Sequence, residues 1–281
     1  MAEGVPKLNI IGCGHVSRTL GRLWHQHRVF TLQDIVNRHM HSAAEAVDFI
    51  GSGNALTQLE QARAADVWMI GTPDASINLT CGHLAESGLL SKGDVVFHCS
   101  GALPSSILNA ATACGAAVAS LHPIRSFANP QQAGNQFTGT WCGAEGDEAA
   151  LAVLEPAFRQ IGAQIVHIDP GAKSVYHGAA VFASNYLVTL IELALQAYEK
   201  AGVPRETAHK LIEPLVRGTV DNVFSVGTEN ALSGPIARRD GATVLAQYRA
   251  LKNWDRDAGR VYKALVRPTK LLALRRQRRG R

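Results

Sequence analysis

The sequence predicts two folds in succession: an α/β part built on a doubly wound parallel sheet, and then an all-helical part. Up to about residue 170, short runs rich in β-branched residues alternate with stretches whose apolar residues recur at helical spacing. Such alternation is typical of a parallel sheet that is covered by helices on both faces. After Asp169-Pro170-Gly171 the helical spacing continues, and no convincing strand follows.

The expected elements are short strands first and longer helices afterwards. Strands are predicted at Leu8–Ile11, Gln33–Val36, Val67–Ile70, Val95–His98, Val118–Leu121 and Gln164–Ile168. Later helices are predicted at about residues 173–201, 205–226, 241–252 and 254–266, the first of them ending at a glycine stop followed by proline. We therefore expect a domain of residues 1–170, a helical domain of residues 171–270 and a basic tail of residues 271–281.

The positive charge of the chain lies at its C-terminal end. The formal net charge is +5, and the last seven residues hold five arginines, so the rest of the chain is neutral. These arginines are Arg275, Arg276, Arg278, Arg279 and Arg281. A basic end of this kind is usually solvated. We therefore expect neither a nucleic acid nor a membrane as a partner.

Cysteine usage and apolar stretches indicate a cytoplasmic protein. The five cysteines are widely spaced without a C-x-x-C pair, which is typical of reduced thiols. No signal peptide fits before the first predicted strand. The most apolar long stretch, residues 178–198, contains Asn185, Glu192 and Gln196, so it is predicted to be a buried helix rather than a membrane span. The eleven histidines are dispersed, and no metal-ligand spacing is evident.

A glycine-rich turn follows the first predicted strand. Gly12–Ser17 has the pattern G-x-G-x-x-S and is followed by a helical stretch. In such a loop the first glycine permits a tight turn, and the second lets the backbone approach a pyrophosphate. The helix N-terminus, here at His15 and Val16, offers free N–H groups and its positive dipole end to the phosphates. The loop, with Gly12 and Gly14 as its key positions, predicts dinucleotide binding.

The end of the second predicted strand indicates which dinucleotide is bound. Asn37 and Arg38 follow directly, and an arginine there suits a 2′-phosphate through its charge and forked donors. This favours NADP(H) over NAD, which would need a carboxylate at that position. The alternative is that Asp34 supplies the carboxylate and the strand stops earlier. Thr72 and Pro73 follow another strand at the edge where a cofactor crosses, and Asp74 can cap the next helix.

Several segments resemble a bacterial family that joins a Rossmann-like domain to a helical domain, the domain of unknown function 2520. They are His98–Ala102, Ser120–Ile124, Lys173–His177, Ala183–Asn185 and Gly234–Asp240. In plan the family is similar to pyrroline-5-carboxylate reductase, the 3-hydroxyacid dehydrogenases and 6-phosphogluconate dehydrogenase. The resemblance implies a Rossmann domain, a 6-phosphogluconate-dehydrogenase-like helical domain and an oxidoreductase activity. The chain departs from the pattern at Ser17, where glycine or alanine is commoner.

Candidate catalytic residues come from the start of the helical part. Hydride delivery to a carbonyl or imine leaves negative charge that needs a proton or hydrogen-bond donor. Lys173 and His177 are four residues apart and share a helix face, so either one is a candidate donor. Asn185 lies nearer the edge of that face and is expected to orient the substrate. Related dehydrogenases use a lysine, and often an asparagine or histidine, from the corresponding helix.

Further candidate substrate contacts follow two other strands and a loop between helices. Ser100 and His122 are expected at the carboxyl edge of the sheet, where each can contact the substrate. Arg238 and Arg239 offer a clamp for an anionic substrate, with Arg238 as the expected contact, and Asp240 can pair with one of them or cap the following helix.

The sequence therefore predicts an NADP(H)-dependent oxidoreductase that reduces a small anionic carbonyl or imine by hydride transfer. A non-catalytic dinucleotide-binding scaffold protein is one alternative, and a deazaflavin-linked NADP oxidoreductase is another. The long apolar helix exceeds what one neighbouring helix can cover, which predicts a homodimer.

Overall fold

The computed structural model describes residues 4–279, with nothing described of the side chains of residues 277–279. The chain forms two compact units, Met1–Val181 and Phe182–Arg281, and each is described by itself. The start of the helical part thus belongs to the first unit. Of the expected basic tail, residues 271–279 continue a helix, and residues 280–281 lie outside the described part.

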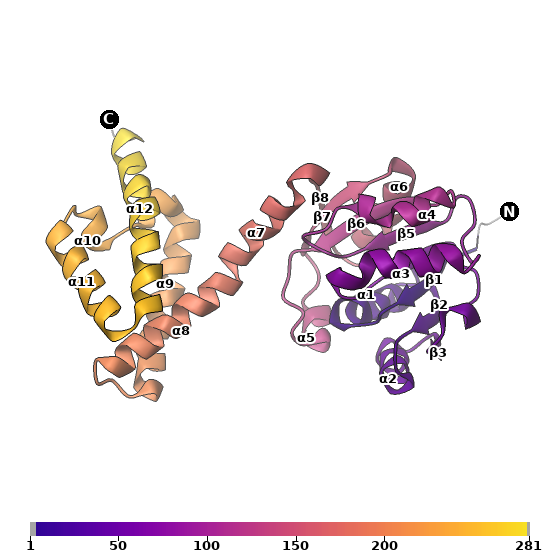
Figure 1. Ribbon diagram of the computed structural model, residues 1–281, viewed down its shortest axis with the longest axis horizontal. Helices are drawn as coiled ribbons and strands as arrows, with labels where there is room; N and C mark the ends of the chain where they lie inside the picture. Colours follow the sequence, from indigo (N-terminus) through magenta and orange to yellow (C-terminus); the bar gives the residue numbers. More distant parts are fainter. Residues whose placement is uncertain (1–3, 280–281) are drawn as a thin grey trace. The chain divides into compact units, whose positions relative to one another are not determined.

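The first unit is built on one eight-stranded sheet with the order β3-β2-β1-β4-β5-β6-β7-β8 (Figure 1). The strands are β1 (Lys7–Ile11), β2 (Thr31–Val36), β3 (Asn54–Leu56), β4 (Val67–Ile70), β5 (Val95–His98), β6 (Ala117–Pro123), β7 (Trp141–Gly146) and β8 (Gln164–His167). All neighbours pair in parallel except β7, which runs antiparallel to β6. The α/β fold with a mostly parallel sheet is therefore confirmed, and the antiparallel β7 is an addition to it.

Helices cover both faces of this sheet (Figure 1). The longer ones are α1 (His15–Gln26), α2 (Met40–Ile50), α3 (Asp74–Glu86) and α6 (Glu148–Gln160). A further long helix, α7 (Lys173–Ala183), follows β8 in the chain. The shorter ones are α4 (Asn109–Ala113), α5 (Pro130–Asn135), η1 (Leu59–Gln61), η2 (Ser105–Leu108) and η3 (Pro170–Ala172). The helices α1, α2 and α6 bury their apolar faces in one core, and α3 and α4 in the other.

An aromatic cluster fills the larger core. Trp24 of α1 makes edge-to-face contacts with Phe30, Phe97 and Phe158, at ring distances of 5.3 to 6.1 Å. Its indole N–H donates to the carbonyl of Ala157, at 3.1 Å. Each aromatic pair of this geometry adds about 1 kcal/mol beyond the buried area. The cluster fixes α1, and with it the glycine turn, against the sheet.

The acidic residue of β2 has a structural partner. Asp34 is buried in the middle of the strand, and its carboxylate accepts hydrogen bonds from Arg63 at 2.6 and 3.1 Å and from Asn54 at 3.2 Å. Burial by itself raises the pKa of Asp34, but the hydrogen bonds from Arg63 outweigh it and the pKa is lowered. Because β2 continues to Val36, the alternative with Asp34 at the strand end is wrong.

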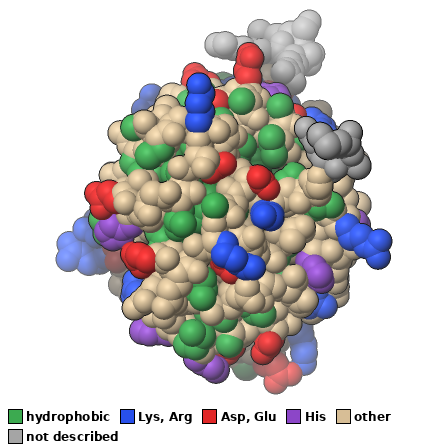
Figure 2. All heavy atoms as spheres, turned by 90° about the vertical axis from the view of Figure 1, so that its right-hand side faces the viewer, with side chains coloured by type: hydrophobic (Ala, Val, Ile, Leu, Met, Phe, Trp, Pro, Cys, Tyr) green, Lys and Arg blue, Asp and Glu red, His purple; other side chains and the backbone are tan. Residues whose placement is uncertain are grey.

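The surface of the first unit is mixed in charge. Figure 2 shows one face, on which acidic and basic side chains are interspersed and apolar side chains are scattered. Among the described residues on this face, no broad field of one sign gathers that would attract a polyanion. This mixture agrees with the near-zero net charge that the sequence gives for the chain without its last seven residues.

The second unit is entirely helical in its described part (Figure 1). It contains α8 (Asn185–Lys200), α9 (Arg205–Ala231), α10 (Gly234–Ala237), α11 (Gly241–Trp254) and α12 (Arg256–Arg279). The predicted helix over residues 173–201 is in fact two helices, because Ser184 has non-helical angles (φ −122°, ψ −71°). The angular argument that placed Asn185 relative to Lys173 on one helix is therefore wrong. A small core of Leu195, Ala208 and Ile212 joins α8 to α9.

Much apolar surface of α7 and α8 is exposed. Pro170–Lys200 is the one described helical stretch that is long and apolar enough to cross a membrane, which by itself is weak evidence for a span. Only 6% of its 18-residue apolar segment is buried. The sequence predicted a buried helix here, and for a single chain that prediction is wrong. The reason is that α8 packs mainly on α9, which leaves the rest of its apolar side chains without cover.

Candidate functional site

The glycine turn is forced by the close approach of two strands. Gly12 follows β1 with a positive φ of 84°, a conformation that glycine adopts without strain. A Cβ at this position would lie 2.7 Å from both the side chain and the backbone nitrogen of Thr72. Only glycine fits between β1 and the chain that leaves β4.

The second glycine faces open space. A Cβ on Gly14 would meet no described atom within 4 Å, and its φ of −78° is an ordinary one. Gly14 precedes α1, and no described side chain caps the N-terminus of that helix. The first N–H groups of α1 therefore have no side-chain acceptor, and the glycine before them leaves room for a phosphate to approach.

The unusual third position of the motif is accommodated by another glycine. Ser17 is buried, and its hydroxyl donates to the carbonyl of Gly12 at 3.2 Å. A Cβ on Gly71 would overlap this hydroxyl and the Gly12 carbonyl. Gly71 thus provides the room that a glycine at the third position normally provides, so the serine does not disturb the turn.

Of the two residues after β2, Asn37 anchors the glycine turn and Arg38 presents an exposed charge. The Asn37 side chain accepts from the backbone N–H of Cys13 at 2.6 Å and donates to the Ser42 carbonyl at 2.9 Å. Arg38 is exposed and has no hydrogen bond or ion pair with any residue in the described range. His15 is fixed by a ring nitrogen 2.8 Å from the Phe127 carbonyl.

The loop after β4 is tied to the loop after β5. Pro73 precedes α3, and the Asp74 carboxylate accepts a hydrogen bond from the Ser100 hydroxyl at 2.8 Å. The expectation that Asp74 caps α3 through its side chain is wrong, because the carboxylate points to Ser100 instead. The Ser100 hydroxyl also accepts the N–H groups of Ala102 and Leu103 at 3.2 and 3.0 Å, so it is fully engaged within the loop.

A neutral histidine continues this network into the sheet. Burial and the nearby Lys173 charge lower the pKa of His98 to about 4. Its Nδ1 accepts the N–H of Ser100 at 3.1 Å, so the proton of the neutral ring lies on Nε2, which donates to the Pro104 carbonyl at 3.3 Å. Ser120 places its hydroxyl 3.3 Å from the same Nδ1.

Lys173 is buried in an ion pair at the end of this network. Its ammonium donates to Ser120 Oγ and, at 2.9 Å, to Glu145 Oε1, and both charged side chains are only 1% exposed. Glu145 also accepts the N–H and the hydroxyl of Ser105 at 2.8 and 2.7 Å. Burial lowers the pKa of Lys173, and the bond to Glu145 opposes that shift. The pair holds the first residue of α7 against β6 and β7.

One turn further along α7, two aromatic rings meet His122. The phenol oxygen of Tyr176 lies 3.2 Å from Nδ1 of His122, and the ring of His177 packs edge-on at 5.5 Å between centroids. A Cβ on Gly101 would overlap His177 Nδ1 and lie 2.8 Å from His122 Nε2. Nδ1 of His177 is buried and has no partner among the described residues. The structure thus brings Lys173, His177 and His122 together at one edge of the sheet.

The remaining predicted site residues lie in the second unit. Asn185 begins α8 and is exposed. Arg238 is exposed at the end of α10, and Asp240 caps α11 by accepting from the backbone N–H of Thr243 at 3.0 Å. The capping role of Asp240 was one of the two sequence expectations and is confirmed. No cluster of three or more potential metal ligands occurs among the described residues.

The fold and the glycine turn of the first unit define a Rossmann-type domain. Residues 4–123 match the model of the Rossmann-like domain, and residues 140–269 match the "Domain of unknown function (DUF2520)". The chain belongs to the family that joins these two domains, as the sequence predicted. No curated protein gives a significant match.

Solved structures share the architecture over nearly the whole chain. Protein TM1727 from Thermotoga maritima is 26% identical, with 96% of this chain and 99% of that chain covered and a TM-score of 0.74. A Plasmodium falciparum pyrroline carboxylate reductase with NADP bound is 14% identical, with 95% and 98% covered and a TM-score of 0.59. An imine reductase from Myxococcus stipitatus in complex with NADP+ is 17% identical, with 98% and 95% covered and a TM-score of 0.63.

Two residues of the site could not be found from the sequence. Glu145 lies on β7, a strand that was not predicted, and its partner Lys173 is distant in sequence. Tyr176 stands beside the predicted His177, but only the fold shows that its hydroxyl reaches His122. The one available signal for Glu145 was its position as an acidic residue directly after the run of small residues Cys142–Ala144.

We predict that Lys173→Met strongly destabilises the first unit, because Glu145 would remain buried without its cation. Breaking such a pair costs about 3–5 kcal/mol. The loss is measured by urea unfolding, followed by tryptophan fluorescence. The double variant Lys173→Met/Glu145→Gln should recover part of it. Lys210→Met, which removes an exposed ion pair, is the matched control and should change little. An equal effect of the two single variants would contradict the structural role of Lys173.

Proposed function

We propose that the protein is an NADP(H)-dependent oxidoreductase that reduces a small anionic carbonyl or imine compound. The observation that carries the proposal is the glycine turn, where Gly14 faces open space before the uncapped N-terminus of α1. Arg38, the residue after the Asn37 that anchors the turn, is exposed and has no partner among the described residues. These groups fit a dinucleotide pyrophosphate and its 2′-phosphate respectively. Asn37, Thr72 and Pro73 border the same turn and complete the proposed cofactor contacts.

The solved relatives support the cofactor and the reaction class. Both reductases described above were solved with NADP or NADP+ bound. At this low sequence identity the two reductases establish only that the fold is shared. The cofactor is therefore proposed for this chain mainly from its own glycine turn and from Arg38. NADPH supplies a hydride when it is bound.

The chain's own residues must then stabilise the negative charge that is left on the carbonyl oxygen or imine nitrogen. Burial, His177 and Lys173 lower the pKa of His122 to about 4, so this ring is neutral near pH 7 and can act as a hydrogen-bond donor. His177 lies beside it and is the proposed proton donor. Lys173, whose ammonium is enclosed by Ser120 and Glu145, is proposed to position α7 and not to touch the substrate.

Two residues of the second unit, Asn185 and Arg238, remain proposed substrate contacts. Asn185 and Arg238 are both exposed there, and the guanidinium of Arg238 suits a carboxylate or phosphate. Ser100 keeps a supporting role, since its hydroxyl is engaged with Asp74 and the following turn.

A titration with NADPH and, separately, with NADH tests this function. We expect tight NADPH binding by calorimetry, weakened about tenfold in Arg38→Ala, which corresponds to about 1.4 kcal/mol. Lys92→Ala, the loss of another exposed cation of the first unit, is the control and should bind as the native chain does. Equal affinity for the two cofactors would overturn the 2′-phosphate assignment, and binding of neither would favour a scaffold protein over an enzyme.

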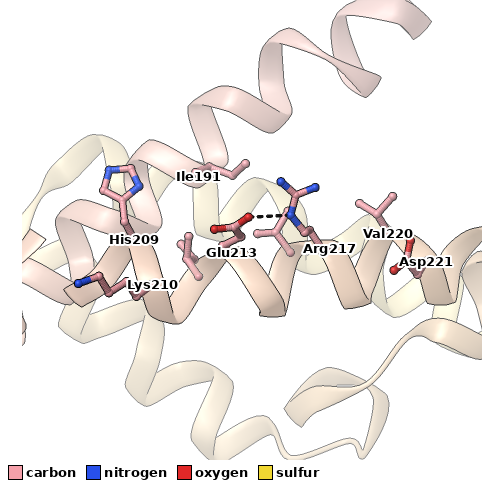
Figure 3. A pocket seen from close by; sticks show the side chains of 9 residues that line it. Ile191, His209, Lys210, Glu213, Arg217, Val220 and Asp221 are labelled. Carbon is pink, nitrogen blue, oxygen red and sulfur yellow. Dashed lines mark hydrogen bonds and ion pairs between the residues drawn. The ribbon is translucent and has the colours of Figure 1, made fainter. Parts of the chain in front are cut away.

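We also propose that the second unit forms a homodimer through α8 and α9. A groove between these helices is lined by apolar Ile191, Ile212, Val216 and Val220, and charged side chains of α9 border it (Figure 3). Further along α9, Phe224 is 86% exposed. Large apolar side chains gathered on one helix face are typical of an interface. The charges along α9 alternate in sign from Lys210 through Glu213 and Arg217 to Asp221, which suits pairing with a second copy.

Light scattering after size exclusion at micromolar concentration tests the dimer. We expect a mass twice the 30.1 kDa of the chain, and a monomer for Val220→Asp, which places a charge in the groove. Val5→Asp, which places the same charge at an exposed valine of the first unit, is the matched control and should remain dimeric. A monomeric native chain would contradict the dimer, and a dimeric Val220→Asp would move the interface away from this groove.

A further inference from the structure

Tyr176 is the one polar partner of His122 that the sequence did not single out. Its phenol oxygen lies 3.2 Å from His122 Nδ1, and the two rings meet edge-to-face at 5.7 Å. Burial raises the pKa of Tyr176 to about 12, so the phenol keeps its proton at every physiological pH. The contact is therefore a hydrogen bond between a protonated phenol and a neutral imidazole.

The surroundings of Tyr176 set the direction of this hydrogen bond. The phenol oxygen lies against the backbone of Gly143, whose N–H by itself would lower the pKa of Tyr176. The phenol proton then needs an acceptor, and His122 Nδ1 is the acceptor that the described residues offer. A Cβ on Gly143 would overlap the phenol oxygen, so glycine at this place in β7 is what lets the tyrosine reach the histidine.

The direction of the bond determines the state of the other ring nitrogen. When Nδ1 of a neutral imidazole accepts a hydrogen bond, the proton lies on Nε2. Nε2 of His122 is on the side of Gly101 and His177, away from Tyr176. The charged groups that act on His122 are Lys173 and Asp74, and His177 is the third titratable neighbour.

We infer that Tyr176 is a positioning residue that holds His122 in the neutral tautomer protonated on Nε2. His122 then presents an N–H donor to the oxygen or nitrogen of the double bond that is reduced, while the hydride goes to its carbon, as a neutral imidazole that polarises a carbonyl without becoming an acid. This role rests on the proposed reductase function, whereas the tautomer itself is a property of the chain alone. His98 is held in the same tautomer by backbone groups, so Tyr176 does for His122 what the Ser100 N–H does for His98.

Nitrogen-15 NMR of the full chain with labelled histidine tests the tautomer directly. The signals of His122 are identified by their loss in His122→Gln. In the native chain at pH 7 we expect Nε2 with the chemical shift of a protonated nitrogen and Nδ1 with that of a hydrogen-bond acceptor. In Tyr176→Phe both nitrogens should move to intermediate values, because the two tautomers then exchange. Tyr262→Phe removes a hydroxyl bonded to Gln247 in the second unit and should leave the His122 signals unchanged.

Two results would overturn the inference: a proton on Nδ1 in the native chain, or a His122 pattern unaltered by Tyr176→Phe. The native spectrum alone assigns the tautomer, so the inference stays testable even if the variant fails to fold. The measurement needs no cofactor. A wrong tautomer with normal NADPH binding would remove this inference only, and a correct tautomer without NADPH binding would remove the proposed function only.

Discussion

The candidate site depends on one buried ion pair, between Lys173 of α7 and Glu145 of β7. Two charges withdrawn from water are tolerated only when each finds its counter-charge and further hydrogen bonds, and here Ser120 and Ser105 supply those bonds. Because β7 runs antiparallel to β6, Glu145 lies opposite Ser120 in register and faces the same ammonium. The pair fixes the start of α7, and this fixed helix start places the next turn of the helix against His122.

The first unit therefore has two candidate functional regions along the carboxyl ends of its parallel strands. At one region the turn after β1 exposes bare backbone and an uncapped helix start. At the other, the loop after β5 and the end of β6 meet α7 around a pair of histidines. The Asp74–Ser100 hydrogen bond connects the loop after β4, beside the turn, with the loop after β5. A dinucleotide site next to the neutral imidazole of His122 would suit the proposed hydride transfer.

Local patterns predicted much of this arrangement. β4 and β5 have the predicted bounds because each is a buried apolar run between polar residues. β7 was missed because the residues after Trp141 are small or polar and gain their strand conformation from β6 and β8. Sequence spacing identified Lys173 and His177 as candidates. The role of Lys173 depends on its burial in the ion pair with Glu145, and only the fold shows that these two residues meet. The break at Ser184 has no helix-breaking residue to mark it.

The central claim is that the turn at Gly12–Gly14 holds a nicotinamide dinucleotide, and Gly14→Leu tests it most directly. Gly14 has an unstrained φ and open surroundings, so a leucine there should leave the thermal midpoint unchanged while occupying the place of the phosphates. The measurement is NADPH affinity of the native chain and the variant, by calorimetry. The account predicts tight binding by the native chain and a loss of at least about a hundredfold, some 2.7 kcal/mol. Unchanged affinity in a folded Gly14→Leu variant would show that the cofactor, if bound, lies elsewhere.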